Sequence, residues 1–162
     1  MNRRLWLALT FAGAAALAYL LVLRPSDEER VRRQVTALSV SVGIDAAERD
    51  PRARPLRIQQ AFRRVFTRSV RVDIADLVED MHGRDELAGM AVSAAETFRA
   101  VTLDFTGVRV EIDGAAQAGR VDAVATLQGT DHDGQPQREV RDVTMLFTEA
   151  DGEWRIASIA TR

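Results

Sequence analysis

The stretch RDVTMLFTEADGEWRIASI, residues 141–159, decides the fold of this chain of 162 residues. Its first part alternates in the manner of a half-buried strand along Arg141, Val143, Met145 and Phe147. Asp151-Gly152 then predicts a tight hairpin turn. A second strand follows, and side chains on a strand alternate between faces. We expect Trp154, Ile156 and Ser158 on one face and Arg155, Ala157 and Ile159 on the other.

Two more strands are expected immediately before this hairpin. Residues 101–112 alternate as one long or broken strand, in which Gly107 predicts a bulge. Residues 121–127 alternate as the next strand, and polar turns at 113–119 and 129–136 separate the three. From residue 100 onward the pattern therefore predicts an antiparallel meander.

Three helices and an early strand precede the meander. Ser26 predicts an N-cap, with Glu29 completing a capping box, and Gly43 predicts the end of that helix. Pro55 suits the first turn of a second helix, and residues 84–86 open a third. Residues 69–74 alternate as a strand between them. The apolar stripes of the three helices are Val31, Val35, Leu38 and Val42; Ile58, Phe62, Val65 and Phe66; and Leu87, Met90, Ala94 and Phe98.

This order predicts an α+β domain over residues 26–162, with three helices packed on one face of a curved antiparallel sheet.

Residues 1–25 are predicted to be an N-terminal membrane anchor. Residues 5–23 carry no charge and would span about 28 Å as a helix, close to the hydrocarbon thickness of a bilayer. The alternative is a cleaved signal peptide, although the run ends in Leu-Arg-Pro without a small-x-small cleavage site. Arg3 and Arg4 favour a cytoplasmic N-terminus, so we expect a single-pass protein of the bacterial inner membrane with a periplasmic C-terminal domain.

Composition excludes several classes of chemistry. The chain has no Cys and no Lys, which removes thiolate metal sites, a cysteine nucleophile and Schiff-base lysines. Two His cannot form an all-imidazole metal cage, and the turn Asp131-His132-Asp133-Gly134 lacks the spaced acids of a calcium loop. We therefore expect no cofactor and no metal site.

The closing Asp151-Gly152-Glu153-Trp154-Arg155-Ile156, the helix opening Gly83-Arg84-Asp85-Glu86-Leu87 and the element order resemble the nuclear transport factor 2-like (SnoaL-like) superfamily over roughly residues 27–162. The resemblance implies a cone-shaped sheet and a fold that serves isomerases, cyclases, hydrolases, transport factors and scaffolds. Enzymes of this superfamily use a carboxylate base with Tyr or Asp donors inside the cone. The single Tyr of this chain, Tyr19, lies in the predicted anchor, which argues against isomerase chemistry.

Candidate site residues follow from these patterns. Asp73, His82 and Asp104 are weak candidates for a general base, each with an alternative reading as a solvent-facing or turn residue. Arg141 would hold an anionic ligand in the cone, or lie at its rim paired with a strand neighbour. The cone would be lined by Phe62, Phe66, Phe105, Arg141, Met145 and Trp154, and the five apolar residues of this set would equally fill a core.

Charge is unevenly distributed along the chain. Residues 49–71 carry eight Arg and one acid, within a chain of net charge −2. This basic segment predicts contact with anionic headgroups or an acidic partner, the alternative being an ordinary solvated helix face. The residues concerned are Arg52, Arg54, Arg57, Arg64 and Arg68.

Together these observations predict a non-catalytic, membrane-anchored binding or scaffold domain, an accessory subunit of a bacterial membrane complex. The alternative is a small-molecule-binding protein or an isomerase- or hydrolase-like enzyme that uses the cone. Expected partners are the membrane and a protein of that complex. The resemblance adds a homodimer through the open face of the sheet, for which Asp142, Thr144, Leu146 and Thr148 would suit. The acidic domain and the 6% aromatic content argue against nucleic acid.

Overall fold

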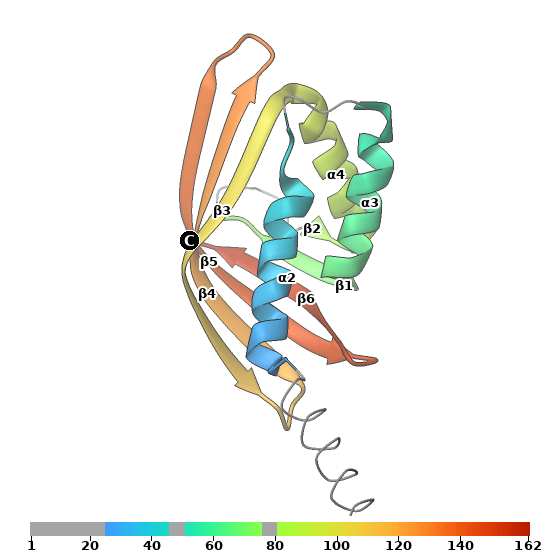
Figure 1. The fold of residues 1–162 in the computed structure, drawn as a ribbon, viewed down its shortest axis with the longest axis vertical. Coiled ribbons are helices and arrows are strands. Elements are labelled where there is room, and N and C mark those ends of the chain that lie inside the picture. Colours follow the sequence, from blue (N-terminus) through green and yellow to red (C-terminus); the bar gives the residue numbers. More distant parts are fainter. Residues whose placement is uncertain (1–24, 46–50, 76–80) are drawn as a thin grey trace, which may run out of the picture.

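A computed structural model describes residues 25–45, 51–75 and 81–162 of the chain. Three helices, α2 (Asp27–Val42), α3 (Arg54–Val65) and α4 (Arg84–Thr97), pack on one face of a curved sheet (Figure 1), and the short helix η1 (Pro51–Ala53) leads into α3. The predicted α+β fold with three helices on a curved sheet is thereby confirmed. The strands are β1 (Phe66–Asp73), β2 (Met81–His82), β3 (Phe98–Asp113), β4 (Ala118–Asp131), β5 (Pro136–Ala150) and β6 (Glu153–Thr161).

The six strands lie in the order β2-β1-β6-β5-β4-β3. Strands β3 to β6 form the predicted antiparallel meander. Strand β1, however, pairs in parallel with β6. The prediction of a wholly antiparallel sheet is therefore wrong at this pair, because alternation reveals the faces of a strand but not its neighbours.

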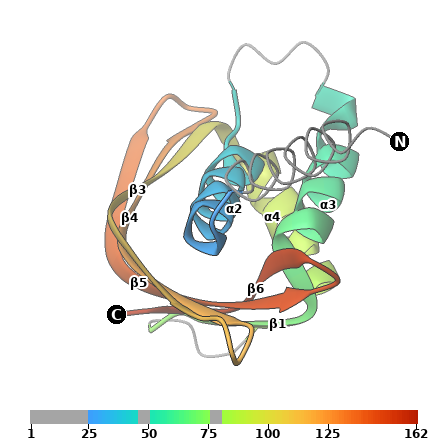
Figure 2. The same cartoon turned by 60° about the horizontal axis from the view of Figure 1, so that its bottom comes forward.

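The sheet curves around α2, as Figure 2 shows, and bulges in β3 and β6 accompany this curvature. In β3 the register shifts between Thr106 and Arg109, where Gly107 adopts a φ of +64°, so the predicted bulge is confirmed. In β6 the register shifts because Ser158 opposes Leu146 while Ile156 opposes Phe147, which leaves Ala157 as an extra residue.

The β6 bulge changes which side chains face the helices. Ile159 pairs with Met145 and packs against the core, on the same side as Trp154 and Ile156. The predicted faces of β6 are correct before Ala157 and wrong after it, because one inserted residue reverses the alternation.

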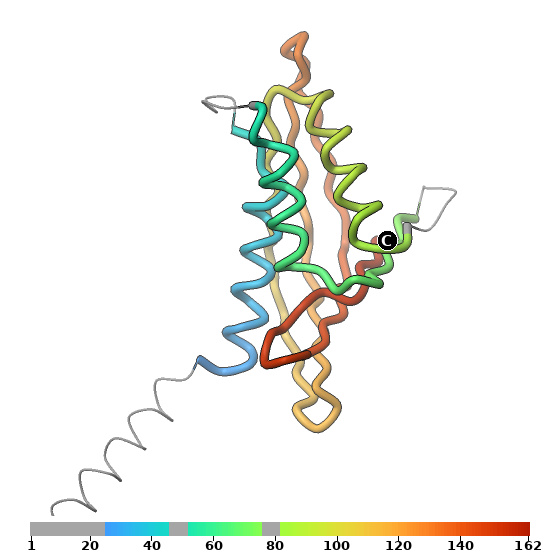
Figure 3. Tube along the Cα trace, turned by 90° about the vertical axis from the view of Figure 1, so that its right-hand side faces the viewer, coloured from blue at the N-terminus to red at the C-terminus, as the bar shows by residue number. Residues whose placement is uncertain are grey.

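The core lies where α2 and α3 meet the concave face of the sheet (Figure 3). From α2, Val31, Val35 and Leu38 are buried, as the stripe predicted. The sheet contributes Val121, Met145 and Ile156, each with no exposed surface. The hairpin turn that joins β5 to β6 has positive φ at Asp151 and Gly152, which confirms the tight turn and aims Trp154 into this core.

The N-terminus of α2 is tied to the β5–β6 hairpin. Ser26 accepts a hydrogen bond from the backbone N–H of Glu29 at 3.2 Å, which confirms the N-cap. The Glu29 carboxylate pairs with Arg33, so the capping box is not completed. Arg30 donates to Asp27 at 2.7 Å, to Glu149 at 3.1 Å and to the carbonyl of Gly152. Asp27 also accepts from the indole N–H of Trp154 at 3.3 Å.

Among the described residues, no helix is long and apolar enough to cross a membrane. The predicted anchor, residues 5–23, and the assignment of residues 1–25 to it lie almost wholly outside the part of the chain that the structure describes.

The α2–hairpin network gives a stability test. We expect Arg30→Met to lower the free energy of unfolding by about 1–3 kcal/mol, because it removes charge-assisted hydrogen bonds to the partly buried Glu149 and to Gly152. Urea unfolding monitored by Trp fluorescence measures the change. Arg33→Met is the matched control, since its ion pair with Glu29 is exposed and its loss costs below about 0.5 kcal/mol. Equal losses in the two variants would contradict the bridging role of Arg30.

Candidate functional site

A cavity of about 390 Å³ lies between the helices and the concave face of the sheet. Its walls come from α2, α3 and α4 and from strands β1, β3, β4, β5 and β6. The larger apolar side chains are Leu38, Val42, Phe62, Phe66, Val72, Ile74, Leu87, Met90, Leu103, Phe105, Leu127, Val143, Met145 and Ile159. The cone of this chain is therefore hollow rather than filled.

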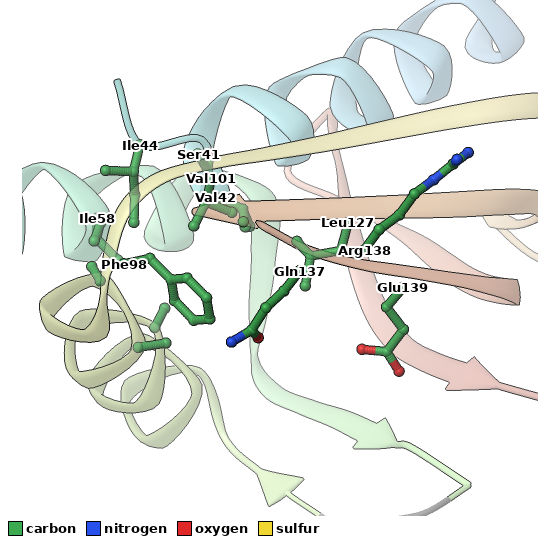
Figure 4. A pocket seen from close by; sticks show the side chains of 14 residues that line it. Ser41, Val42, Ile44, Ile58, Phe98, Val101, Leu127, Gln137, Arg138 and Glu139 are labelled. Carbon is green, nitrogen blue, oxygen red and sulfur yellow. The ribbon is translucent and has the colours of Figure 1, made fainter. Parts of the chain in front are cut away.

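A second chamber of about 320 Å³ adjoins the first (Figure 4). Ile44, Ile58, Phe98 and Val101 form its apolar end, and Gln137 and Glu139 of β5 form its polar side. The two chambers share five wall residues, so they adjoin at these side chains. The shared residues are Val42, Ala91, Ala94, Leu127 and Glu139.

The hollow arises from small side chains on α4. Ala88 and Ala95 of α4 are buried, whereas Ala91 and Ala94 line both chambers. The predicted stripe of α4 thus faces the cavity: Leu87 and Met90 lie in its wall, and Met90 is 46% exposed. Phe98, the last residue of that stripe, begins β3 instead. An Ala-rich helix leaves space that larger residues would close.

The structure brings together five of the six residues predicted to line the cone. Phe62, Phe66, Phe105, Arg141 and Met145 all lie in the wall of the larger chamber. Trp154 does not: it is 2% exposed and occupies the packed end of the sheet beside Gly119 and Asp27. Its place in the predicted lining is wrong because periodicity shows the face of the sheet but not the position along the cone.

Among the described residues, the charged side chains that line the cavity all belong to the first part of β5. Arg141 donates from Nε to the Glu139 carboxylate, two residues earlier on the same face of the strand. The Arg141 side chain is 24% exposed and that of Glu139 is 51% exposed, so the cation is the more buried partner. Arg141 therefore pairs with a strand neighbour at the rim, and its role towards an anionic ligand stays a prediction.

The candidate catalytic residues lie elsewhere. Asp73, His82 and Asp104 are all exposed, and none of them lines either chamber. Asp104 alternates with Leu103 and Phe105, which face the cavity, so its carboxylate is on the opposite face. Within residues 25–45, 51–75 and 81–162, no group of three or more acidic or His side chains is arranged to hold a metal ion.

Among the wall residues that sequence reasoning did not assign to the cone, Ala91, Ala94 and Glu139 line both chambers. The only indication for Ala91 and Ala94 was their spacing on the helix, and small residues at such positions usually belong to a packed core. Glu139 was signalled by its alternation with Arg141 and Val143, which places it on the concave face. Neither signal distinguishes a cavity wall from a close-packed layer.

The predicted basic patch is divided by the fold. Arg52, Arg57 and Arg64 are exposed on or beside α3, and Arg68 is exposed in β1. Arg54 is half-buried and donates to the carbonyl of Ala95 at 3.0 Å, near the C-terminus of α4. A cation suits that position, since the helix dipole places negative charge there. Arg54 therefore joins two helices and does not belong to the exposed set.

The convex face of the sheet carries Thr144 and Leu146, two of the four residues predicted for a dimer contact, with Leu146 45% exposed. Asp122 is held here by hydrogen bonds from Arg120, at 2.8 and 2.9 Å, and from the Thr144 hydroxyl at 2.7 Å. These donors stabilise the ionised carboxylate and lower the pKa of Asp122 to about 2. Asp142 and Thr148 lie on the same face of β5.

Comparisons with known proteins agree on the fold. The SnoaL-like domain family matches residues 57–160. A nuclear transport factor 2-like superfamily protein from Salmonella enterica has a TM-score of 0.66 at 13% identity, covering 83% of this chain and 89% of its own. A protein from Kribbella flavida has a TM-score of 0.69 at 15% identity, covering 83% and 88%. A candidate scytalone dehydratase from Novosphingobium aromaticivorans has a TM-score of 0.65 at 13% identity, covering 82% and 80%. No curated protein sequence matches the chain.

Asp122 provides a test of the convex-face network. Because its pKa is lowered by folding, ionised Asp122 stabilises the fold at neutral pH, and this contribution falls as the pH drops from about 4 towards about 2. Titration of the carboxyl ¹³C resonance should give a midpoint near 2, and Arg120→Gln should raise the pKa towards 3.8. Arg33→Gln on α2 is the control. An unchanged midpoint in Arg120→Gln would contradict the assigned cause.

Proposed function

Since the chain belongs to the SnoaL-like domain family of the nuclear transport factor 2-like superfamily, we propose that it binds an apolar small molecule in the concave cavity without chemically altering it. The observation that carries this proposal is the hollow, largely apolar space of two adjoining chambers. Specific small-molecule sites have volumes of roughly 300–1,000 Å³ and apolar walls with few polar groups. The larger chamber, at about 390 Å³, falls within that range.

Binding is favoured over catalysis by the composition of the walls. General acid–base catalysis needs a titratable side chain within hydrogen-bond reach of the reacting atoms. The described lining carries no Asp and no His, and its carboxylate, Glu139, is engaged by Arg141. Similarity to a candidate dehydratase at 13% identity concerns the fold, and the described lining of the two chambers does not contain an acid–base pair of Asp and His.

A ligand series tests the proposal. Hexanol, octanol, decanol and dodecanol should displace the neutral fluorescent probe N-phenyl-1-naphthylamine, with Kd falling about fourfold per added CH₂ until the chamber is full. Ala94→Phe should abolish probe binding while retaining the fold, because Ala94 is exposed towards both chambers and a phenyl ring has room there. Ser93→Phe, on the neighbouring exposed position outside the lining, is the control. Retained binding in Ala94→Phe would refute the cavity as the site.

The cellular setting proposed for this domain is the periplasmic side of a bacterial inner membrane, where it would serve a membrane complex as an accessory binding subunit. The uncharged residues 5–23 support attachment, and α2 begins shortly after them in the sequence, at Asp27. A ligand that partitions into the bilayer would then meet the cavity at short range. This setting would explain why an apolar site is useful to the protein.

Membrane attachment has its own test. Replacing Ala15 and Leu17 by Arg should move the full chain from the membrane pellet to the supernatant after alkaline carbonate extraction, since each central Arg costs about 3 kcal/mol in a spanning helix. The control places the same two charges at Gln60 and Ser93, which are exposed in the domain, and should leave the chain in the pellet. A parent chain found in the supernatant would refute the attachment.

A further inference from the structure

Resting on the proposed function, we propose that the ligand is an amphiphile with a carboxylate head, which binds Arg141 at the rim formed by β5 while the apolar tail occupies the cavity. The inference starts from the distribution of polarity in the walls. In both chambers the charged side chains are Arg138, Glu139 and Arg141, all within four residues of one strand. The remainder of the described walls is almost entirely apolar, so among these walls a bound molecule meets charge only on the β5 side.

Burial at this rim favours an anion. Arg138 extends along the strand away from Gln137 and Glu139 (Figure 4), so the charged pair that meets the larger chamber is Glu139 with Arg141. An ammonium head would pair with Glu139 and draw it from Arg141, which is the more buried of the two. Withdrawing a carboxylate from a half-buried cation is costly, whereas exchanging it for another carboxylate is not.

The existing ion pair shows how such a head would bind. Glu139 occupies the position of a carboxylate beside the Arg141 guanidinium, with half of its own side chain in solvent. Rotation of Glu139 into water would let a ligand carboxylate take over this contact. An Arg–carboxylate contact is charge-assisted and stronger than a neutral hydrogen bond, so the exchange retains a strong interaction.

The dimensions of the cavity set the size of the tail. At roughly 30 Å³ per non-hydrogen atom, the volume of a water molecule in the liquid, the larger chamber holds on the order of a dozen atoms. A saturated chain of about ten to twelve carbons fits that space. Longer chains would exceed the larger chamber, so we expect affinity to stop rising beyond about twelve carbons.

The test compares dodecanoate, dodecanol and dodecylamine as competitors of N-phenyl-1-naphthylamine at neutral pH. We expect dodecanoate to bind about tenfold more tightly than dodecanol, and dodecylamine to bind most weakly. Arg141→Met should remove the preference for dodecanoate and leave the Kd of dodecanol within about twofold, while Arg141→Lys should keep part of it. Glu139→Gln should tighten dodecanoate, because it removes the competing carboxylate, and weaken dodecylamine.

The chain supplies a matched control. Glu153 and Arg155 form the same two-residue ion pair on β6, outside both chambers. Glu153→Gln and Arg155→Met should leave all three affinities unchanged. Circular dichroism of each variant checks the fold, and Glu139→Gln and Arg141→Lys supply the answer if Arg141→Met unfolds.

The outcomes separate the two proposals. Equal Kd values for the three compounds, unaltered in Arg141→Met and Glu139→Gln, would overturn the carboxylate inference and leave the apolar cavity as the binding site. Failure of the probe and of all three compounds to bind would overturn both. A dodecanoate preference that persists in Ala94→Phe would place the acid on the outer surface and also overturn the inference.

Discussion

The seating of α2 in the concave face of the sheet is the contact on which the rest of the structure depends. Val31, Val35 and Leu38 fill one side of the cone, and the Arg30 network fixes the N-terminus of the helix to the β5–β6 hairpin. At the other end, Ile44 and Val101 exchange backbone hydrogen bonds of 2.8 and 3.0 Å. With α2 held at both ends, the distance between helices and sheet is set, and the side chains of α3 and α4 decide whether the remaining space is filled.

That space divides the concave face into a packed end and an open end. At the packed end Trp154 lies over Gly119, where an added methyl group would come within 3.1 Å of Ile112. The large side chain on β6 is therefore accommodated by a residue without a side chain on β4. At the open end the opposing surfaces are Ala91 and Ala94 of α4 and Ala125 of β4, and small residues face small residues. Close packing at one end stabilises the fold, which allows the other end to remain hollow.

The sequence predicted the faces of most elements and failed where the fold depends on distance or on one inserted residue. The stripe of α2, the bulge at Gly107 and the turn at Asp151 follow from local preferences, and all are present. The parallel pairing of β1 with β6 cannot be predicted in this way, because the periodicity of a strand does not identify its neighbour. The reversal of the faces of β6 after Ala157 cannot be predicted either, because the sequence pattern does not mark the inserted residue. For the site, helical spacing placed Phe62, and strand alternation placed Phe105 and Arg141, on the right surface. It could not separate them from Trp154, since a cavity wall and a core layer have the same pattern.

The charged rim illustrates how environment, rather than local sequence, distinguishes a site. Strands β4, β5 and β6 each carry an acid and an Arg two residues apart: Arg120 with Asp122, Glu139 with Arg141, and Glu153 with Arg155. On the convex face Asp122 also accepts a hydrogen bond from the Thr144 hydroxyl, so the Arg120–Asp122 pair is fixed to the neighbouring strand. The pair on β6 lies outside the chambers. Glu139 and Arg141 alone among the three border an apolar cavity, with the cation inward and the carboxylate towards water. In that setting the carboxylate is the exchangeable partner, and the same short motif changes from a surface ion pair to a means of selecting a ligand.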